Sequence, residues 1–153
     1  MRRHDRELTD IKEIIRVIKK CDVCRLALHN DGYPYILPLN FGMQTDGKNI
    51  TLYFHGANEG TKYELIKKDN RVSFEMDTSH QLVMNPEKGT CTMKYESVIG
   101  HGRIEIVPES EKEHALSVLM AQYHQEEFSY NKAVIPATTV MKLMVEQVTG
   151  KAR

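Results

Sequence analysis

The sequence has no excess of either charge, no long apolar run and only three cysteines. Its 21 Lys and Arg residues equal its 21 Asp and Glu residues, so no overall field would draw the protein onto nucleic acid or an anionic membrane. No run of about 18 apolar residues is present to span a bilayer, and the N-terminus lacks the apolar part of a secretory signal. We therefore expect a cytoplasmic protein that binds neither nucleic acid nor a membrane.

The cysteine and histidine residues do not have the spacing of a metal site. Cys21 and Cys24 form a single CxxC without the second ligand pair of a structural zinc site. They lie where an amphipathic helix gives way to an apolar strand, which favours buried or half-buried thiols over redox or metal chemistry. The seven histidines are scattered without paired ligand spacing, at positions 4, 29, 55, 80, 101, 114 and 124. A metal protein is therefore the less favoured alternative.

The hydrophobic pattern predicts one mainly β domain over residues 1–153, with peripheral helices. Helices are predicted at 11–18 after Asp10, at 62–68, and from a capping box of Ser110 and Glu113 to about Tyr123. After that helix, 123–130 reads as a helix end and loop rather than an active-site lid. Six strands are predicted, at 24–28, 35–43, 50–55, 72–76, 94–107 and 139–148. They form hairpins without βαβ alternation, which indicates a closed antiparallel barrel.

Two of these strands carry residues unusual for a strand interior. Pro38 removes a ladder donor, and Asn40 on the same face offers donors and an acceptor, so this strand can turn free polar groups towards a flat heterocycle. Gly100 and Gly102 predict a bulge, a bend, or the close approach of a backbone or ligand. Barrel curvature alone explains these two glycines equally well. A polar excursion with Pro86 and Gly89 is predicted as a loop or irregular edge.

The segment 51–66, TLYFHGANEGTKYELI, changes from a strand-like to a helical period and could hold an anion. Two glycines let the backbone approach a ligand, and Thr61 and Glu64 have the spacing of a capping box. Lys62 adds positive charge near the helix start, and His55 at the strand end can donate a hydrogen bond. From these residues alone a capped surface helix after a glycine turn is the favoured alternative, because the segment is not a full P-loop.

Four segments in this order and spacing resemble the pyridoxamine 5'-phosphate oxidase-like flavin-binding split barrels. The nearest branch is similar to the nitroimidazole-resistance (Nim-type) proteins, whose N-terminal pattern resembles MRRHDRELTD and CRLAL here. The resemblance covers nearly the whole chain, and its segments are GYPYILPLNFG (32–42), YFHGANEGTKYELI (53–66), RVSFEMD (71–77) and YESVIGHGRI (95–104).

The resemblance implies a six-stranded antiparallel Greek-key split barrel that forms a homodimer with two flavin sites at the subunit interface. FMN is the implied cofactor, and FAD is possible. One strand would follow the isoalloxazine ring, the segment after His55 would border the ribityl chain and phosphate, Lys62 would neutralise the phosphate, and the long strand would complete the pocket. The implied cofactor-binding residues are Pro38, Leu39, Asn40, His55, Gly56, Ala57, Thr61, Lys62, Ser97, Val98 and Gly100.

The implied activity is that of an FMN-dependent oxidoreductase. Reducing equivalents would pass from a nicotinamide or another donor to a small electron-poor acceptor such as a nitroaromatic compound, with His55 as the candidate catalytic group. No histidine follows His124, so the C-terminal Arg and His clamp of pyridoxamine phosphate oxidases is missing and that reaction is not expected. A flavin carrier, store or sensor without turnover is the alternative, and a deazaflavin or haem stays open as the cofactor.

Overall fold

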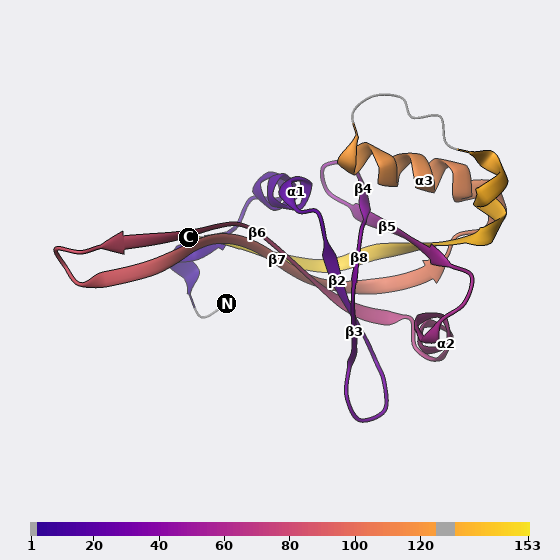
Figure 1. Cartoon of the computed structure of the whole chain (residues 1–153), viewed down its shortest axis with the longest axis horizontal. Helices are drawn as coiled ribbons and strands as arrows, with labels where there is room; N and C mark the ends of the chain where they lie inside the picture. The colour runs from indigo at the N-terminus through magenta and orange to yellow at the C-terminus, as the bar shows by residue number, and fades with distance from the viewer. Residues whose placement is uncertain (1–2, 125–130) are drawn as a thin grey trace.

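One antiparallel sheet runs through the protein, and helices pack around it. The computed structural model describes residues 3–124 and 131–153; the predicted loop 123–130 lies largely outside them. Figure 1 shows the elements in chain order: η1 (His4–Arg6), β1 (Glu7–Leu8), α1 (Ile11–Lys20), β2 (Cys24–Leu28), β3 (Tyr35–Leu39), β4 (Gly42–Thr45), β5 (Ile50–Ala57), α2 (Thr61–Lys68), β6 (Arg71–Asn85), β7 (Thr90–Ile106), α3 (Glu109–Tyr123), η2 (Lys132–Ala137) and β8 (Thr138–Ala152). None of the helices in the described part of the chain is long and apolar enough to cross a bilayer.

The strands form an open path rather than a closed barrel. Their order is β3-β2-β6-β7-β8-β5-β4, with β1 paired to β8 outside this path. The predicted mainly β, antiparallel architecture is confirmed, but the described chain has eight strands instead of six and the barrel is not closed. Because β3 and β4 are the two ends of the path, each pairs on one side only, with β2 and β5 respectively.

The predicted single strand 35–43 is wrong, because the chain breaks between β3 and β4. At the break the Asn40 side-chain amide donates to the Asp22 carbonyl (3.1 Å), and the Phe41 amide donates to the Tyr123 hydroxyl (2.9 Å) instead of to a strand. Tyr123 is on α3, and α3 also packs so closely on Gly42 that a Cβ there would overlap the backbone of Leu119. Because of these contacts the chain leaves β3 after Leu39, and β4 pairs with β5 at the opposite end of the strand order.

Two of the three predicted helix caps, those of α2 and α3, are replaced by other N-cap residues. At α1 the prediction is confirmed, since the Asp10 carboxylate accepts from the Lys12 amide (2.9 Å). The capping boxes predicted at Thr61 and Ser110 are wrong. Gly60, with φ of +138°, is the N-cap of α2, and Pro108 is the N-cap of α3. A glycine in this region and the fixed φ of proline each start the helix before the expected hydroxyl.

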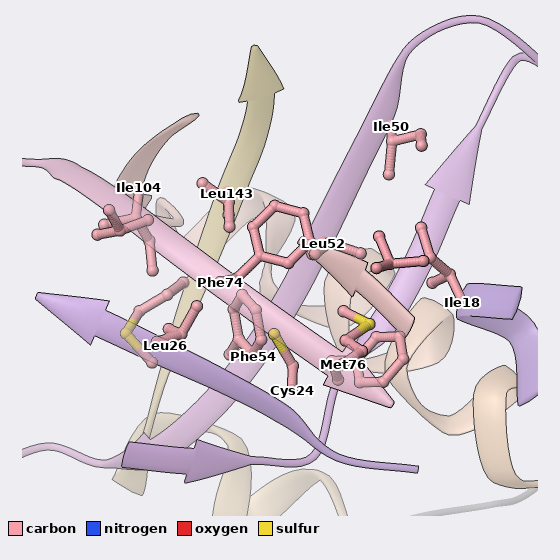
Figure 2. Close-up of a cluster of buried hydrophobic side chains, with 14 of the residues drawn as sticks. Ile18, Cys24, Leu26, Ile50, Leu52, Phe54, Phe74, Met76, Ile104 and Leu143 are labelled. Atoms are coloured by element: carbon pink, nitrogen blue, oxygen red, sulfur yellow. The ribbon is translucent and has the colours of Figure 1, made fainter. Parts of the chain in front are cut away.

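A single large core lies inside the curled sheet. Figure 2 shows its closely packed side chains, among them Phe54, Phe74 and Leu26, which are almost completely buried. Cys21 and Cys24 both lie in this core, so the predicted burial of these two thiols is confirmed. Burial raises the pKa of the Cys21 thiol to about 12, which keeps it protonated and unreactive near neutral pH.

The hairpin of β6 and β7 is much longer than predicted. Its pairing runs from Arg71 and Arg103 out to Asn85 and Thr90, interrupted by a register shift after Thr78. The predicted loop is therefore limited to the tip, where the Gly89 amide donates to the Pro86 carbonyl (3.3 Å). We call residues 80–94 the arm, because they project away from the rest of the molecule, at the end opposite α2 (Figure 1).

Candidate functional site

The corner between β5 and α2 brings together five of the predicted site residues. His55, Gly56 and Ala57 end β5, a three-residue loop follows, and Thr61 and Lys62 open α2. Burial alternates along the end of the strand, with Phe54 in the core and His55 exposed. The corner therefore presents an open backbone and polar side chains on the outside of the sheet.

The Lys62 ammonium group is held over the open backbone of this corner. Its Nζ atom lies 4.2 Å from the centre of the Tyr63 ring, and a Cβ added to Gly56 would lie 3.2 Å from it. The Tyr63 ring is fixed in turn, because it is buried and its hydroxyl donates to the Ala57 carbonyl (2.6 Å). Within the described residues, Lys62 makes no ion pair or side-chain hydrogen bond, so its charge is available to an anion.

The loop and helix start add further donors beside Lys62. The first amides of a helix have no acceptor inside the helix, and its N-terminus favours negative charge. Here the Tyr63 amide donates to the Gly60 carbonyl (3.1 Å), while Thr61 is exposed. The loop is braced by Asn58, whose side-chain amide donates to the Pro136 carbonyl (3.1 Å) and whose oxygen accepts from the Thr139 hydroxyl (2.8 Å).

This donor set fits a phosphate group. An ammonium group, free helix-start amides and a glycine backbone that a side chain would fill are the features of an anion cradle. Sequence reasoning missed Tyr63 and Asn58, which hold the lysine and the loop in place. The only signal for them was their position within the glycine-containing segment, since the partners of Asn58 lie about 80 positions later in the chain.

His55 faces outward without a partner to orient it. It pairs in register with Val140 on β8, and no described residue forms a hydrogen bond with its imidazole ring. A general acid or base is normally oriented by a second group. The surroundings in one chain therefore do not give His55 a defined proton-transfer role, and its catalytic assignment stays a prediction.

The remaining predicted residues lie in β3 and β7, except Asn40, which lies at the break between β3 and β4. Pro38 and Leu39 are in the end strand β3, with Pro38 exposed and paired with Arg25 of β2. Ser97 on β7 is partly buried, whereas Val98 is fully buried in the core. Gly100 also faces the core, where a Cβ would lie 2.6 Å from the Phe74 ring. Val98 and Gly100 can thus reach a ligand only through their backbones.

Ser97 lies far from the β5–α2 corner within one chain. Gly56 pairs with Thr139 at one end of β8, and Ser97 pairs with Lys151 near the other end. These two β8 residues are twelve positions apart, which corresponds to about 40 Å of strand. Pro38 is not separated by this distance, because four positions further along the chain Gly42 pairs with Tyr53 of β5. One chain alone therefore does not unite the predicted site.

The part of the chain that the structure describes holds no group of three or more His, Cys, Asp or Glu residues able to hold a metal ion. The acidic side chains near Pro38 are engaged with an arginine instead. Arg25 donates to Glu75 (3.0 Å) and to Asp77 (2.5 Å). Burial and the Asp77 carboxylate raise the pKa of Glu75, and the contact with Arg25 only partly offsets them.

An open antiparallel sheet curled around one core, with helices over its ends, is the architecture of the split barrels. Residues 10–152 match the sequence profile of the pyridoxamine 5'-phosphate oxidase family. The chain belongs to this family, which confirms the predicted resemblance. A comparison with curated proteins gave no match.

Solved structures support the same assignment. A protein from Bacteroides thetaiotaomicron, provisionally assigned to 5-nitroimidazole antibiotic resistance, is 32% identical, with 95% of this chain and 86% of that chain covered and a TM-score of 0.83. An FAD-binding protein from Mesorhizobium loti is 26% identical over 97% of both chains, with a TM-score of 0.70. An FAD and haem binding protein from Mycobacterium smegmatis shares the fold at 17% identity, with 96% and 73% covered and a TM-score of 0.81.

Proposed function

We propose that this protein binds a flavin nucleotide through its phosphate at the β5–α2 corner and acts as a flavin-dependent oxidoreductase. The observation that carries the proposal is the Lys62 ammonium group, which lies without an acidic partner among the described residues over the backbone of Gly56. Family membership and the FAD-binding relative from Mesorhizobium loti favour a flavin among the phosphate-bearing ligands. FMN is the proposed form, and FAD presents the same phosphate chemistry at this point.

The proposed site is shared by two copies of the chain. Ser97 lies about 40 Å from Gly56 along the register of β8 in the same chain, which is too far for one flavin to contact both. In a homodimer with twofold symmetry, the Ser97 end of one subunit meets the β5–α2 corner of the other, and this arrangement produces two identical sites. The subunits would then contribute the ring-binding and phosphate-binding parts separately.

The residues of this chain would bind and orient the cofactor, which supplies the redox chemistry when bound. Lys62 and the α2 amides would neutralise the phosphate, and Gly56 would let the ribityl chain lie against the strand. The exposed face of β3 carries Pro38, whose missing amide leaves a flat apolar surface for the isoalloxazine ring. We propose a nicotinamide as the electron donor and a small electron-poor compound, such as a nitroaromatic, as the acceptor.

Removing the charge of Lys62 tests the phosphate assignment. In Lys62→Met we expect flavin to bind about 10- to 100-fold more weakly, because a hydrogen bond to a charged group contributes roughly 1.5–3 kcal/mol. Lys67→Met is the matched control, since Lys67 is exposed in the last turn of the same helix. Titration of the flavin-free protein with FMN, FAD and riboflavin, followed by flavin fluorescence, measures each affinity. Equal FMN affinity in the two variants would reject the corner as the phosphate site.

Turnover is tested separately on the flavin-loaded protein. Anaerobic addition of NADH or NADPH should bleach the flavin absorbance, and a nitroaromatic compound should restore it. Protein that binds flavin tightly but is bleached by neither nicotinamide would instead be a flavin carrier or sensor. Sedimentation velocity of the same sample reports whether the loaded protein is a dimer.

A further inference from the structure

The arm, residues 80–94, leaves the sheet in a fixed direction. At its base the Glu96 carboxylate accepts hydrogen bonds from Arg16 (2.6 Å) and Lys20 (2.6 Å) of α1, and from the Ser79 hydroxyl (2.8 Å). Ser79 occupies the register shift of β6 with φ of +59°, a conformation that needs support from its surroundings. These contacts tie the base of the arm to α1, so the arm is a braced extension rather than a loose loop.

The arm has one apolar face that the described part of its own chain does not cover. Leu82 pairs directly with Met93, and Met84 with Cys91, so these four side chains lie on the same face of the ribbon. Leu82, Met84 and Met93 are 57%, 67% and 46% exposed, and Cys91 is also exposed. The opposite face is mostly polar. The four residues Leu82, Met84, Cys91 and Met93 form what we call the arm face.

A two-stranded ribbon with an exposed apolar face is marginally stable in water by itself. Thioether side chains are adaptable and common on binding surfaces. The arm face is thus suited to bury itself against another surface. A second copy of this chain is the occupant that the topology favours, since the arm begins directly next to Ser97: Asp77 pairs with Ser97 and Thr78 with Glu96, after which the arm follows.

We propose that the arm of one subunit packs its face against the partner subunit beside the β5–α2 corner and walls off the site there. This inference rests on the proposed function, in which the Ser97 end of one subunit meets that corner of the other. The arm, extending about 20 Å beyond this end, must then run along the second copy or into water. Because burying its apolar face is favourable, the arm runs along the second copy.

The surface beside the corner is complementary to the arm face. Asn58 joins the β5–α2 loop to η2 through the Pro136 carbonyl, and η2 exposes apolar side chains next to this loop. Val134 is 54% exposed, and Pro136, Ala137 and Ala57 are exposed as well. These short side chains leave room for the longer Leu and Met side chains of the arm. Packed there, the arm would exclude water from the bound phosphate and strengthen its contact with Lys62.

Cys91 allows a direct test with the natural sequence. It is the exposed thiol, whereas Cys21 and Cys24 are buried, so a maleimide carrying a photoactivatable benzophenone should label Cys91 selectively. Labelled protein is mixed with 15N-labelled protein, irradiated, and digested for mass spectrometry. We expect cross-links from Cys91 to the other copy, within 55–62 or 133–138.

The matched control moves the probe to the other face of the ribbon. Cys91→Ser/Thr92→Cys places the thiol one residue along the strand, on the face that carries Val83, and we expect loss of the intermolecular product. Equal products from both positions, cross-links only within one chain, or cross-links elsewhere on the partner would overturn the inference. Flavin titration of unlabelled protein separates the two proposals. If the protein is dimeric and binds flavin but gives none of these cross-links, the proposed packing of the arm is rejected and the flavin site is not. If the cross-links form in protein that binds no flavin, the flavin site is rejected and the packing of the arm is not.

Discussion

Replacing Glu96 by Gln should destabilise the protein in a pH-dependent way. The Glu96 side chain is 13% exposed and contacts Arg16 and Lys20 at 2.6 Å each. Burial alone would raise its pKa, but the hydrogen bonds from Arg16, Lys20 and Ser79 outweigh burial and lower the pKa to about 2. The ionised carboxylate of Glu96 is therefore more stable in the folded protein than in the unfolded chain. Replacement by Gln removes that charge while keeping the side-chain shape.

The size of the effect follows from the two pKa values. The difference between the ordinary 4.5 and about 2, at about 1.4 kcal/mol for each pH unit, sets an upper bound of about 3 kcal/mol at neutral pH. Water screens part of this, since Arg16 and Lys20 are 40% and 45% exposed. We therefore expect Glu96→Gln to lower the free energy of unfolding by about 1–2 kcal/mol at pH 7.

The pH dependence gives the sharper test. Because the folded-state pKa is depressed, the stabilisation is complete above pH 4.5 and is lost as the pH falls towards 2. The difference in unfolding free energy between the wild type and Glu96→Gln should therefore shrink by at least about two fifths between pH 7 and 3.5. Urea denaturation followed by circular dichroism at these two pH values measures it.

Glu13→Gln is the control for this prediction. Glu13 pairs with the same Arg16 at 2.9 Å but is 50% exposed, so its loss should leave the stability nearly unchanged. A Glu96→Gln variant as stable as Glu13→Gln at pH 7 would refute the reasoning. A stability difference of the same size at pH 7 and at pH 3.5 would refute the ionic origin.

Two further predictions concern packing and thiol accessibility. A Cβ in Gly102→Ala would overlap the Met144 carbonyl oxygen of the neighbouring strand, so we expect a loss of about 3 kcal/mol or more in urea denaturation. The control Gly32→Ala meets no atom and adds only the strain of its φ of +86°, about 1 kcal/mol; equal losses would contradict the steric explanation. In a thiol titration with Ellman's reagent at pH 8, we expect one thiol per native chain and three after denaturation. Three fast-reacting thiols in the native protein would contradict the buried positions of Cys21 and Cys24.

Local pattern was sufficient for the elements whose stabilising contacts are close in sequence. The apolar period and Asp10 predicted α1, and alternating residues on either side of a turn predicted the β2–β3 hairpin, both of which are confirmed. The β5–α2 corner could also be predicted from the sequence, because its glycines, His55 and Lys62 lie within eight residues of one another. The roles of these residues towards a flavin stay a prediction.

Local pattern failed where a distant partner decides the conformation. The alternation at 35–43 continues through Asn40 and Phe41, but the Tyr123 hydroxyl, more than 80 positions later, accepts the Phe41 amide. Pro86 and Gly89 in a polar stretch predict a loop or irregular edge, whereas the β6–β7 pairing continues out to Asn85 and Thr90. The distance between the corner and Ser97 follows only from strand register, which no single segment contains.

The sequence by itself predicted the family through the resemblance of four segments, and it predicted most of the secondary structure, since periodicity and turn residues act over a few neighbouring positions. The tertiary structure decided that the sheet stays open, that Ser97 lies far along the sheet from the β5–α2 corner, and that a projecting arm begins beside Ser97. The physical reason is that strand order and register depend on hydrogen bonds between residues far apart in the chain, and these become visible only when the sheet has been assembled.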